Sequence, residues 1–294
     1  MRIAIYRLIL KLLSLFSLPI NHRIGSLIGR ALYRFDNDVR RTCMQNLKLC
    51  LPELDDSHRQ QLCRDTLIEM GKSVTELGPV WLWPEQRMLK LMTNTVNEQI
   101  ARDAIDQGKG MILLTPHIGC WEIAGLYCAT IFNITSLYRP PRLQALETFL
   151  LKARQRSGAT LVPTNIHGVK ALFKALANNN TVGILPDQDP SGDGGVFAPY
   201  FGINAHTIKL IPRLIQKTGA QVCIMYAERM TDGKGYTLHF KKPDDEIYSG
   251  DLPTAVAAMN RSVEACVREI PEQYQWSYKR FKTRPKGEKS LYIN

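Results

Sequence analysis

From residue 93 onward, short apolar runs alternate with amphipathic stretches, and this alternation restricts the possible folds more than any other feature of the chain. The runs that have the length and composition of strands are residues 111–114, 134–137, 160–162, 182–185 and 221–226. The stretches with helical spacing are residues 121–131, 143–156, 167–178, 207–218 and 253–269. Strands that alternate with helices form βα units, whose strands run parallel and whose helices cover the sheet. The sequence therefore predicts an α/β fold with a mostly parallel sheet flanked by helices.

The chain before residue 93 lacks this alternation and has a helical pattern. Residues 3–18 are mostly apolar, and Arg7, Lys11 and Ser14 are spaced so that they share one stripe of a helix. Such a helix can lie in a membrane interface with its cations at anionic head groups. A spanning helix, which needs about 20 apolar residues, and a helix packed on the protein's own core are the alternatives. We divide the chain into an N-terminal helical membrane-associating region, 1–92, and an α/β core, 93–294.

The balance of charges and the cysteine count restrict the partners and the compartment. Lys and Arg number 38 and Asp and Glu 27, which gives a net charge of +11. A basic surface attracts nucleic acid, anionic lipid or an acidic protein, and charge alone does not choose among them or exclude a merely basic soluble enzyme. The seven cysteines are odd in number and contain no C-x-x-C pair, which argues against a disulfide framework and a zinc ribbon and favours a reducing compartment.

One motif has the form expected of a catalytic site. Residues 110–122 read GMILLTPHIGCWE, an apolar strand followed by a turn that contains Pro116 and Gly119. Two residues five positions apart on one helix are rotated by about 140° and cannot face each other. We therefore expect His117 in the strand-to-helix turn and Glu122 in the first helical turn, where the carboxylate can hold the imidazole.

This arrangement suits a general base. Glu122 would fix the tautomer of the ring, and His117 would remove the proton from an incoming hydroxyl. No G-x-S-x-G segment supplies a nucleophilic serine, so the hydroxyl belongs to the substrate and the transfer is direct. Nothing in the sequence activates Cys120 as a nucleophile, and we interpret it as a small packing residue.

The motif and several later segments resemble a known family. TPHIGCWE is similar to the first motif of glycerolipid-type acyltransferases, the H-x4-D/E superfamily, and its Trp-Glu ending resembles the late acyltransferases of lipid A biosynthesis in Gram-negative bacteria. Residues 183–202, GILPDQDPSGDGGVFAPYFG, resemble that family's D-Q-x-P…G-V-F-x-P-F-F-G block. The other similar segments are residues 137–142, 150–163, 211–222 and 275–285. Pro141-Arg142 departs from the family's usual Leu-x-Asn continuation, which leaves the acceptor open.

The resemblance implies a reaction, a location and a set of residues. It implies transfer of a fatty acyl chain from acyl carrier protein to a hydroxyl of a Kdo-bearing lipid A precursor, at the cytoplasmic face of the bacterial inner membrane. His117 is then the base and Glu122 its partner, and Arg154 and Asp187 line the cleft. A guanidinium suits a phosphate or carboxylate, and Arg139 after a strand end is a second anion candidate. Asp187 could orient a sugar hydroxyl or hold its loop. The expected partners are acyl carrier protein, an anionic membrane surface and a glycolipid acceptor.

Other functions stay open at this point. The same reaction on a glycerophospholipid, a mannolipid or an aminolipid is one alternative, a membrane-associated thioesterase or lipid hydrolase is another, and a non-catalytic membrane-binding protein is a third. We expect no cofactor apart from the acyl carrier thioester as co-substrate. We expect no metal, because no His or Cys accompanies Asp189 and Asp193 in the sequence. We expect no nucleic acid, because the basic segment 279–289 has no RNA-binding signature.

Overall fold

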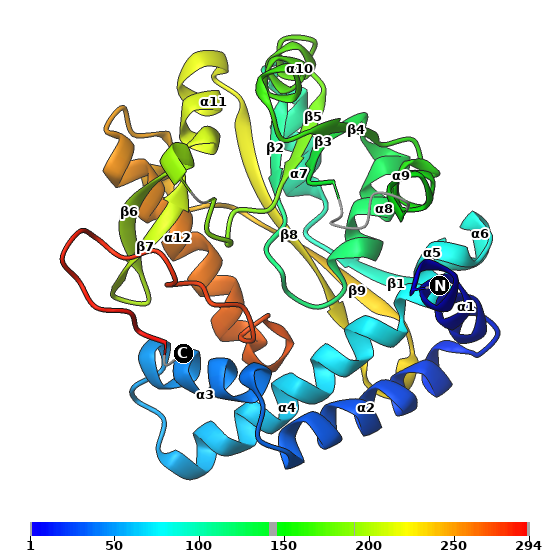
Figure 1. Cartoon of the computed structure of the whole chain (residues 1–294). Helices are drawn as coiled ribbons and strands as arrows, with labels where there is room; N and C mark the ends of the chain where they lie inside the picture. The colour runs from blue at the N-terminus through cyan, green and yellow to red at the C-terminus, as the bar shows by residue number, and fades with distance from the viewer. Residues whose placement is uncertain (1, 141–145, 191, 293–294) are drawn as a thin grey trace.

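A seven-stranded sheet forms the centre of the computed structural model, which describes residues 2–140, 146–190 and 192–292 (Figure 1). Its strands, in sheet order, are β1 (Met92–Val96), β9 (Tyr236–Lys241), β8 (Gln221–Arg229), β2 (Met111–Leu114), β5 (Thr181–Ile184), β3 (Ile134–Tyr138) and β4 (Thr160–Pro163). Neighbouring strands are parallel except β8 and β9. The predicted α/β class with a mostly parallel sheet is therefore confirmed, and each of the predicted strands is present.

Helices cover both faces of this sheet. One face carries α3 (Asp38–Cys50), α4 (Asp56–Thr75), α10 (Ile166–Ala177), α11 (Leu210–Thr218) and α12 (Leu252–Glu269). The other carries α1 (Arg2–Ser14), α5 (Leu77–Leu82), α6 (Glu85–Leu89), α7 (Gln99–Asp106), α8 (Trp121–Ile131) and α9 (Glu147–Gln155). Along β2, Ile112 and Leu114 join the first cluster, whereas Met111 and Leu113 join the second. All four residues of this strand are buried, as expected when helices cover a parallel sheet on both sides.

The register of β2 and β5 determines which loops meet at the edge of the sheet. Leu114 at the end of β2 pairs with Ile184 at the end of β5. The carboxyl ends of parallel strands lie at the same edge, so residues that follow the two strands by equal distances come close together. His117 and Asp187 each follow their paired residue by three positions. The fold therefore brings these two residues together across 70 positions of sequence.

Helices α3 and α4, and the helix that precedes them, lie along the lower side of the molecule in Figure 1. There α2 (Leu18–Arg34) packs closely on α4. The two backbones meet at glycines, because a Cβ on Gly71 would lie 2.0 Å from the carbonyl oxygen of Gly25. This contact fixes the position of the C-terminal half of α4, which carries charged residues that reach the sheet.

Helix α1 buries only part of its apolar surface. Leu10 is buried against the protein, and the Arg7 guanidinium lies 5.7 Å from the centre of the Phe149 ring. The large apolar side chains of α1 and its following turn that are exposed are Ile5, Leu8, Ile9, Leu12, Leu15 and Phe16. Within the described residues, no helix combines the length and the apolar content that crossing a membrane requires.

Several elements differ from the sequence prediction. Strands β1 and β9 were not predicted, and neither was the hairpin of β6 (Gly195–Tyr200) and β7 (Ile203–Ile208), which forms a second sheet. The helix predicted at 207–218 begins only at Leu210, because residues 207 and 208 belong to β7. Of the helix predicted at 143–156, residues 143–145 lie outside the described part of the chain, and α9 begins at Glu147.

Candidate active site

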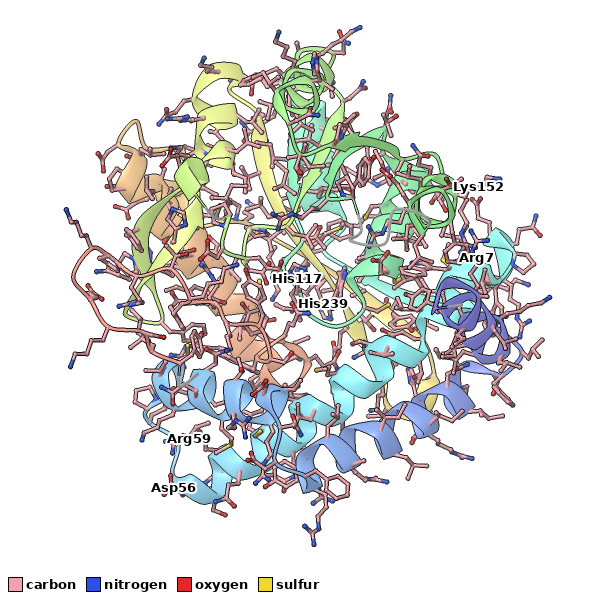
Figure 2. All side chains as sticks on the ribbon, viewed as in Figure 1. Arg7, Asp56, Arg59, His117, Lys152 and His239 are labelled. Atoms are coloured by element: carbon pink, nitrogen blue, oxygen red, sulfur yellow. The ribbon has the colours of Figure 1, made fainter. Side chains whose placement is uncertain are left out.

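His117 lies in the turn between β2 and α8, near the centre of the molecule (Figure 2). Glu122 stands in the first turn of α8, so the predicted placement of both residues is confirmed. The turn is tight: Gly119 has a φ of +59°, and a Cβ there would lie 1.9 Å from the Ala227 carbonyl oxygen. A residue with a side chain could not take this place without moving the end of β8.

Asp187 holds His117 by two hydrogen bonds. Its Oδ2 accepts the backbone N–H of His117 at 2.9 Å, and its Oδ1 lies 2.8 Å from Nδ1 of the ring. Burial alone would raise the pKa of Asp187, but the imidazole and the two hydrogen bonds outweigh it and hold that pKa below its usual value. The carboxylate is therefore charged and accepts a hydrogen bond from the Nδ1–H of the ring, and in this tautomer the lone pair of the imidazole is on Nε2.

Gln188 occupies the other side of the imidazole. Its side-chain nitrogen lies 3.2 Å from Nε2 of His117 and donates to Oε1 of Gln275 at 3.0 Å. The Gln275 backbone N–H in turn donates to the His117 carbonyl oxygen. An amide N–H is thus held beside the basic nitrogen of the ring, in a position that no feature of the sequence had indicated.

Glu122 does not contact His117 as expected. Its carboxylate accepts hydrogen bonds from the Trp81 indole and from Nε of Arg154, both at 3.0 Å, and Nη2 of Arg154 completes a bidentate pair. The first turn of α8 directs this side chain toward α5 and α9, whereas the imidazole points toward the β5 loop. The expected orienting role of Glu122 is therefore corrected: Asp187 has the contact with the ring.

Arg154 is the partner of Glu122 at the cavity. The Glu122 carboxylate raises the pKa of Arg154 above its usual value. The Glu122 side chain is 9% exposed and the Arg154 side chain 35%, so the carboxylate lies behind the guanidinium as seen from solvent. The guanidinium is therefore the more accessible member of the pair, and Glu122 holds it in place.

A cavity of about 460 Å³ joins these groups. His117, Glu122, Gln188, Arg139 and Arg154 all line it. The apolar side chains in its wall are Leu113, Trp121, Leu126, Ile134, Leu137, Ala159, Leu161, Ile184, Leu185, Ile208 and Met225. The cavity therefore offers an apolar volume with a base and two guanidinium groups on its surface, the kind of lining that a ligand with a long hydrocarbon part and an anionic part requires.

Of the three residues predicted to bind substrate in the cleft, two line the cavity and one does not. Arg154 and Arg139 line the cavity, and Arg139 is exposed just beyond β3. Asp187 is only 3% exposed and lies behind His117, so it cannot touch a substrate as the prediction of a cleft-lining residue required. No role at the site was predicted for Gln188, Gln275 or Trp81, because their roles depend on contacts between distant segments.

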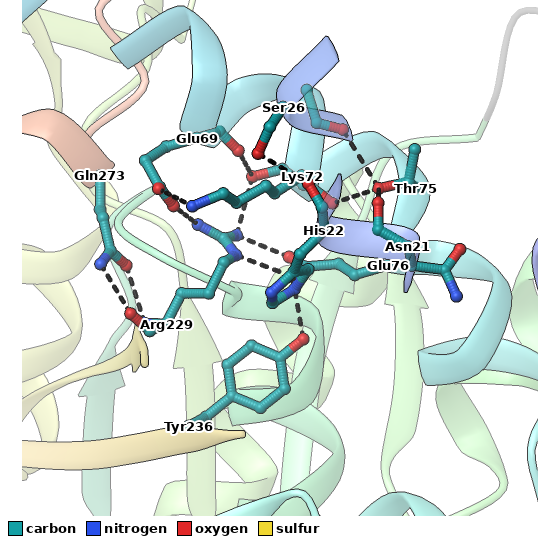
Figure 3. A network of polar contacts seen from close by, with 12 residues as sticks. Asn21, His22, Ser26, Glu69, Lys72, Thr75, Glu76, Arg229, Tyr236 and Gln273 are labelled. Carbon is teal, nitrogen blue, oxygen red and sulfur yellow. Dashed lines mark hydrogen bonds and ion pairs between the residues drawn. The ribbon is translucent and has the colours of Figure 1, made fainter. Parts of the chain in front are cut away.

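A buried polar network braces the turn that holds His117 (Figure 3). The Gly119 N–H donates to the Gln273 carbonyl oxygen, and the Gln273 side chain makes hydrogen bonds to the backbone N–H and C=O of Arg229. Arg229 is buried and forms a bidentate pair with Glu76, whose carboxylate also accepts from the Tyr236 hydroxyl. These hydrogen bonds connect the end of β8, the C-cap of α4 and the turn between β2 and α8.

Glu76 is the charged centre of this network. Burial alone would raise its pKa, but Arg229, with its charge and its hydrogen bonds, outweighs burial and lowers the pKa well below the usual value. His22 from α2 adds a contact of 3.2 Å to the same carboxylate. A buried charge of this kind is stable only while its partners remain in place.

Cys120 lies between His117 and Glu122 in the sequence and is a buried free cysteine. Burial raises the pKa of the Cys120 thiol well above its usual value, so its packing role is consistent with the sequence interpretation. Within residues 2–140, 146–190 and 192–292, no group of three or more His, Cys, Asp or Glu side chains is placed to hold a metal ion.

Comparison with known proteins agrees with the motifs. The model of the family described as bacterial lipid A biosynthesis acyltransferase matches residues 2–283. The chain is 31% identical to the lipid A biosynthesis palmitoleoyltransferase of Escherichia coli (strain K12) over 272 residues. The aligned region covers 92% of this chain and 86% of that protein. It is 30% identical to the lipid A biosynthesis lauroyltransferase of the same organism, over 93% of this chain and 89% of that protein. A lipid A biosynthesis acyltransferase of Haemophilus influenzae is 26% identical over 96% of the chain and 89% of that protein.

Proposed function

Because the chain belongs to the bacterial lipid A biosynthesis acyltransferase family, we propose that it moves a fatty acyl chain from acyl carrier protein to a hydroxyl of a Kdo-bearing lipid A precursor. The observation that carries the proposal is the cavity, in which an oriented histidine and an arginine share an apolar wall. An acyl chain fits the apolar part of this wall, and a phosphorylated glycolipid fits the basic part.

His117 acts as the general base in this proposal. Its Nδ1–H donates to Asp187, so the lone pair on Nε2 faces the cavity and can accept a proton. The acceptor hydroxyl gives its proton to Nε2 while its oxygen forms a bond to the thioester carbonyl carbon. The charge of Asp187 stabilises the imidazolium that results.

Gln188 stabilises the negative charge that forms on the carbonyl oxygen. Its amide N–H lies beside Nε2 and is positioned by Gln275, so a small rotation aims it at an oxygen bound next to the base. The tetrahedral intermediate then collapses: the carbon–sulfur bond breaks, and the departing thiolate takes the proton back from His117. The products are an ester and the free thiol of the carrier.

Arg154 and Glu122 form the anion clamp of the site. The carboxylate of Glu122 fixes the plane of the guanidinium, and Arg154 keeps donors for a phosphate of the acceptor. Arg139 lies on the wall of the same cavity and supplies a second positive charge. In this proposal the carboxylate of the H-x4-E motif acts on substrate binding through Arg154.

The exposed apolar side of α1 supports a proposal for how the enzyme binds its membrane. Leu8, Leu12 and Leu15 are about half or more exposed, and Arg7 and Lys11 lie on the same helix. We propose that α1 lies in the plane of the membrane interface, with these cations at anionic head groups, at the cytoplasmic face of the inner membrane. The acceptor lipid and the catalytic cavity then meet at one surface.

Reconstitution tests the proposed function. Purified protein is given acyl carrier protein loaded with lauroyl, myristoyl or palmitoleoyl chains, together with a Kdo-bearing lipid A precursor that lacks secondary acyl chains. Mass spectrometry should detect the precursor with one added acyl chain, and His117→Ala should abolish its formation. In cells, deletion of the gene should remove one acyl chain from lipid A.

Other results would overturn the proposal in distinct ways. Rapid release of free fatty acid that does not depend on the precursor would assign the protein to the hydrolases. Unchanged lipid A in the deletion strain, with another lipid losing an acyl chain, would assign a different acceptor. Full activity of His117→Ala would remove the histidine from the mechanism.

A further inference from the structure

Helices α10 and α11 carry basic side chains and no acidic ones. The five basic residues are Lys170 and Lys174 on α10, Lys209 at the N-cap of α11, and Arg213 and Lys217 within α11. Four of them are exposed and Lys209 is half-buried. We name these five side chains the α10–α11 cationic surface.

The two helices lie side by side, so their charges belong to one surface. They contact each other, and the Lys217 ammonium lies 5.9 Å from the centre of the Phe173 ring of α10. The spacing of four residues between Lys170 and Lys174, and between Arg213 and Lys217, aligns each pair on one helix face. Among the described residues none of the five forms a salt bridge, and the acidic residues Asp244 and Glu246 near α11 pair with Arg261 instead.

This surface begins at the rim of the catalytic cavity. Ile208, directly before Lys209, lines the cavity, and so does Thr164, two residues before the start of α10. Two apolar side chains are exposed between the charges and the cavity: Ile166 is 63% exposed and Leu185, itself a lining residue, 37%. A partner bound to the cations could therefore pass an attached acyl chain over an apolar rim into the site.

The surface faces away from the helix that we assign to the membrane. The apolar sides of α10 and α11, with Leu172 and Leu214, pack in the core cluster on one face of the sheet. Helix α1, with Leu10, packs in the cluster on the opposite face. Figure 1 shows α10 and α11 at the top of the molecule and α1 at its right edge. A flat bilayer that holds the exposed apolar residues of α1 does not reach α10 and α11, so a soluble acidic partner fits this surface better than a lipid.

We propose that the α10–α11 cationic surface is the docking site for the acidic acyl carrier protein that delivers the thioester. The inference rests on the proposed function, because it assumes that the donor is a carrier protein and not a small thioester. Opposite charges on two proteins raise the rate of encounter and orient the partners before contact. Docking here leaves the α1 side free for the lipid acceptor, so donor and acceptor approach the cavity from different faces.

Charge reversal near the rim tests the proposal. The variant Lys170→Glu/Arg213→Glu is compared with Lys286→Glu/Lys289→Glu, which makes the same change of charge at exposed positions of the C-terminal segment. With acyl carrier protein as donor, the first variant should lose on the order of tenfold or more in kcat/KM, chiefly through KM, and the control should not. When the same acyl chain is attached to pantetheine, which lacks the carrier protein, both variants should have the kcat/KM of wild type. Raising the salt concentration should lower the wild-type rate toward that of the first variant.

The outcomes separate the docking site from the proposed function. If wild type uses the carrier thioester and Lys170→Glu/Arg213→Glu has the same kcat/KM as the control variant, the docking site is refuted and the proposed function stands. If wild type uses neither donor, the proposed function fails. An equal loss with acyl-pantetheine would show that the substitutions damage the site itself and would overturn the docking role. Loss of binding to vesicles that contain phosphatidylglycerol would assign the surface to the membrane and likewise overturn the proposal.

Discussion

Replacing Asp187 by asparagine keeps the size of the side chain and changes the hydrogen bonds that it can offer to His117. Both oxygens of Asp187 accept, one from the His117 backbone N–H and the other at Nδ1. Asparagine has one acceptor and one donor at these two places. The backbone N–H cannot accept, so the asparagine oxygen must face it, and the NH₂ group then faces the ring. Nδ1 must become the acceptor, and the proton moves to Nε2.

The wrong tautomer removes the base from the reaction. With a proton on Nε2, the atom that faces the cavity has no lone pair for the acceptor hydroxyl. The same exchange in serine protease triads, which also leaves the geometry intact, lowers kcat by about 10⁴. We expect a loss of about 10³–10⁴ in kcat for Asp187→Asn, which corresponds to about 4–5.5 kcal/mol of transition-state stabilisation. KM for the donor and the acceptor should change little, because Asp187 lies behind the ring.

Steady-state kinetics with acyl carrier thioester and glycolipid acceptor measure this loss. Asp193→Asn is the matched control, since it makes the same chemical change at an exposed residue of the same loop. Thermal unfolding establishes that each variant is folded. The reasoning is refuted if Asp187→Asn keeps a kcat within about threefold of wild type while Glu122→Gln loses the 10³–10⁴ expected of the orienting residue. That result would return the orienting role to Glu122.

The remaining predictions concern the oxyanion donor, the anion clamp and the buried network. Gln188→Ala should lower kcat by about 10²–10³ in steady-state assays, because one oxyanion donor is lost. Arg154→Ala and Glu122→Gln should each raise KM for the phosphorylated acceptor. In a double-mutant cycle the KM of the double variant should be little higher than that of Arg154→Ala alone. Arg229→Met should lower the free energy of unfolding by about 3–5 kcal/mol in urea titrations, because it leaves a buried carboxylate unpaired. Since the pKa of Glu76 is lowered in the folded state, its stabilising contribution is present at neutral pH and lost as pH falls below about 5, and Glu76→Gln should flatten this dependence.

Each of these predictions has an outcome that contradicts it. An unchanged kcat for Gln188→Ala would assign the oxyanion to another donor. Strictly additive effects of the Arg154 and Glu122 substitutions would show that the two residues do not act as one clamp. An Arg229→Met protein as stable as wild type would mean that the network adds nothing to folding at neutral pH.

The sequence predicts the strands that contain a short apolar run, including the edge strand β4, and misses strands whose apolar residues are interrupted by polar ones. Strand β2, Met111–Leu114, is apolar throughout because helices cover both of its faces, and such runs are visible without any knowledge of the fold. Strand β1 reads MTNTV and lies at the edge of the sheet, where its side chains are half or fully exposed. Strand β9 alternates buried and half-buried residues, so its sequence contains no continuous apolar run.

The residues of the candidate active site show a similar limit at the level of side chains. The turn between β2 and α8 follows from local sequence, so His117 and Glu122 could be placed correctly. The partner of His117 depends on the pairing of Leu114 with Ile184, which joins strands far apart in the chain. Once that register is known, Asp187 follows by counting three residues from each strand end. The family resemblance places the residue in the cleft but gives no information on what it touches.

The spacing of the H-x4-E motif makes physical sense if its two residues serve two different ion pairs. Helix α8 begins at Trp121, between the two residues, and the Trp121 ring packs edge-on against the imidazole with centroids 5.0 Å apart. The histidine thus remains on the sheet side of the helix start, where Asp187 can reach it, and Glu122 is turned toward Arg154. His117, Glu122 and Arg154 line one cavity, so under the proposed function proton transfer and anion binding occur on the two sides of the start of a single helix. If Glu122 contacted His117 directly, His117 would lose Asp187 or Arg154 would lose Glu122. Under the proposed function, the separation of the two residues therefore lets one short motif serve both proton transfer and anion binding.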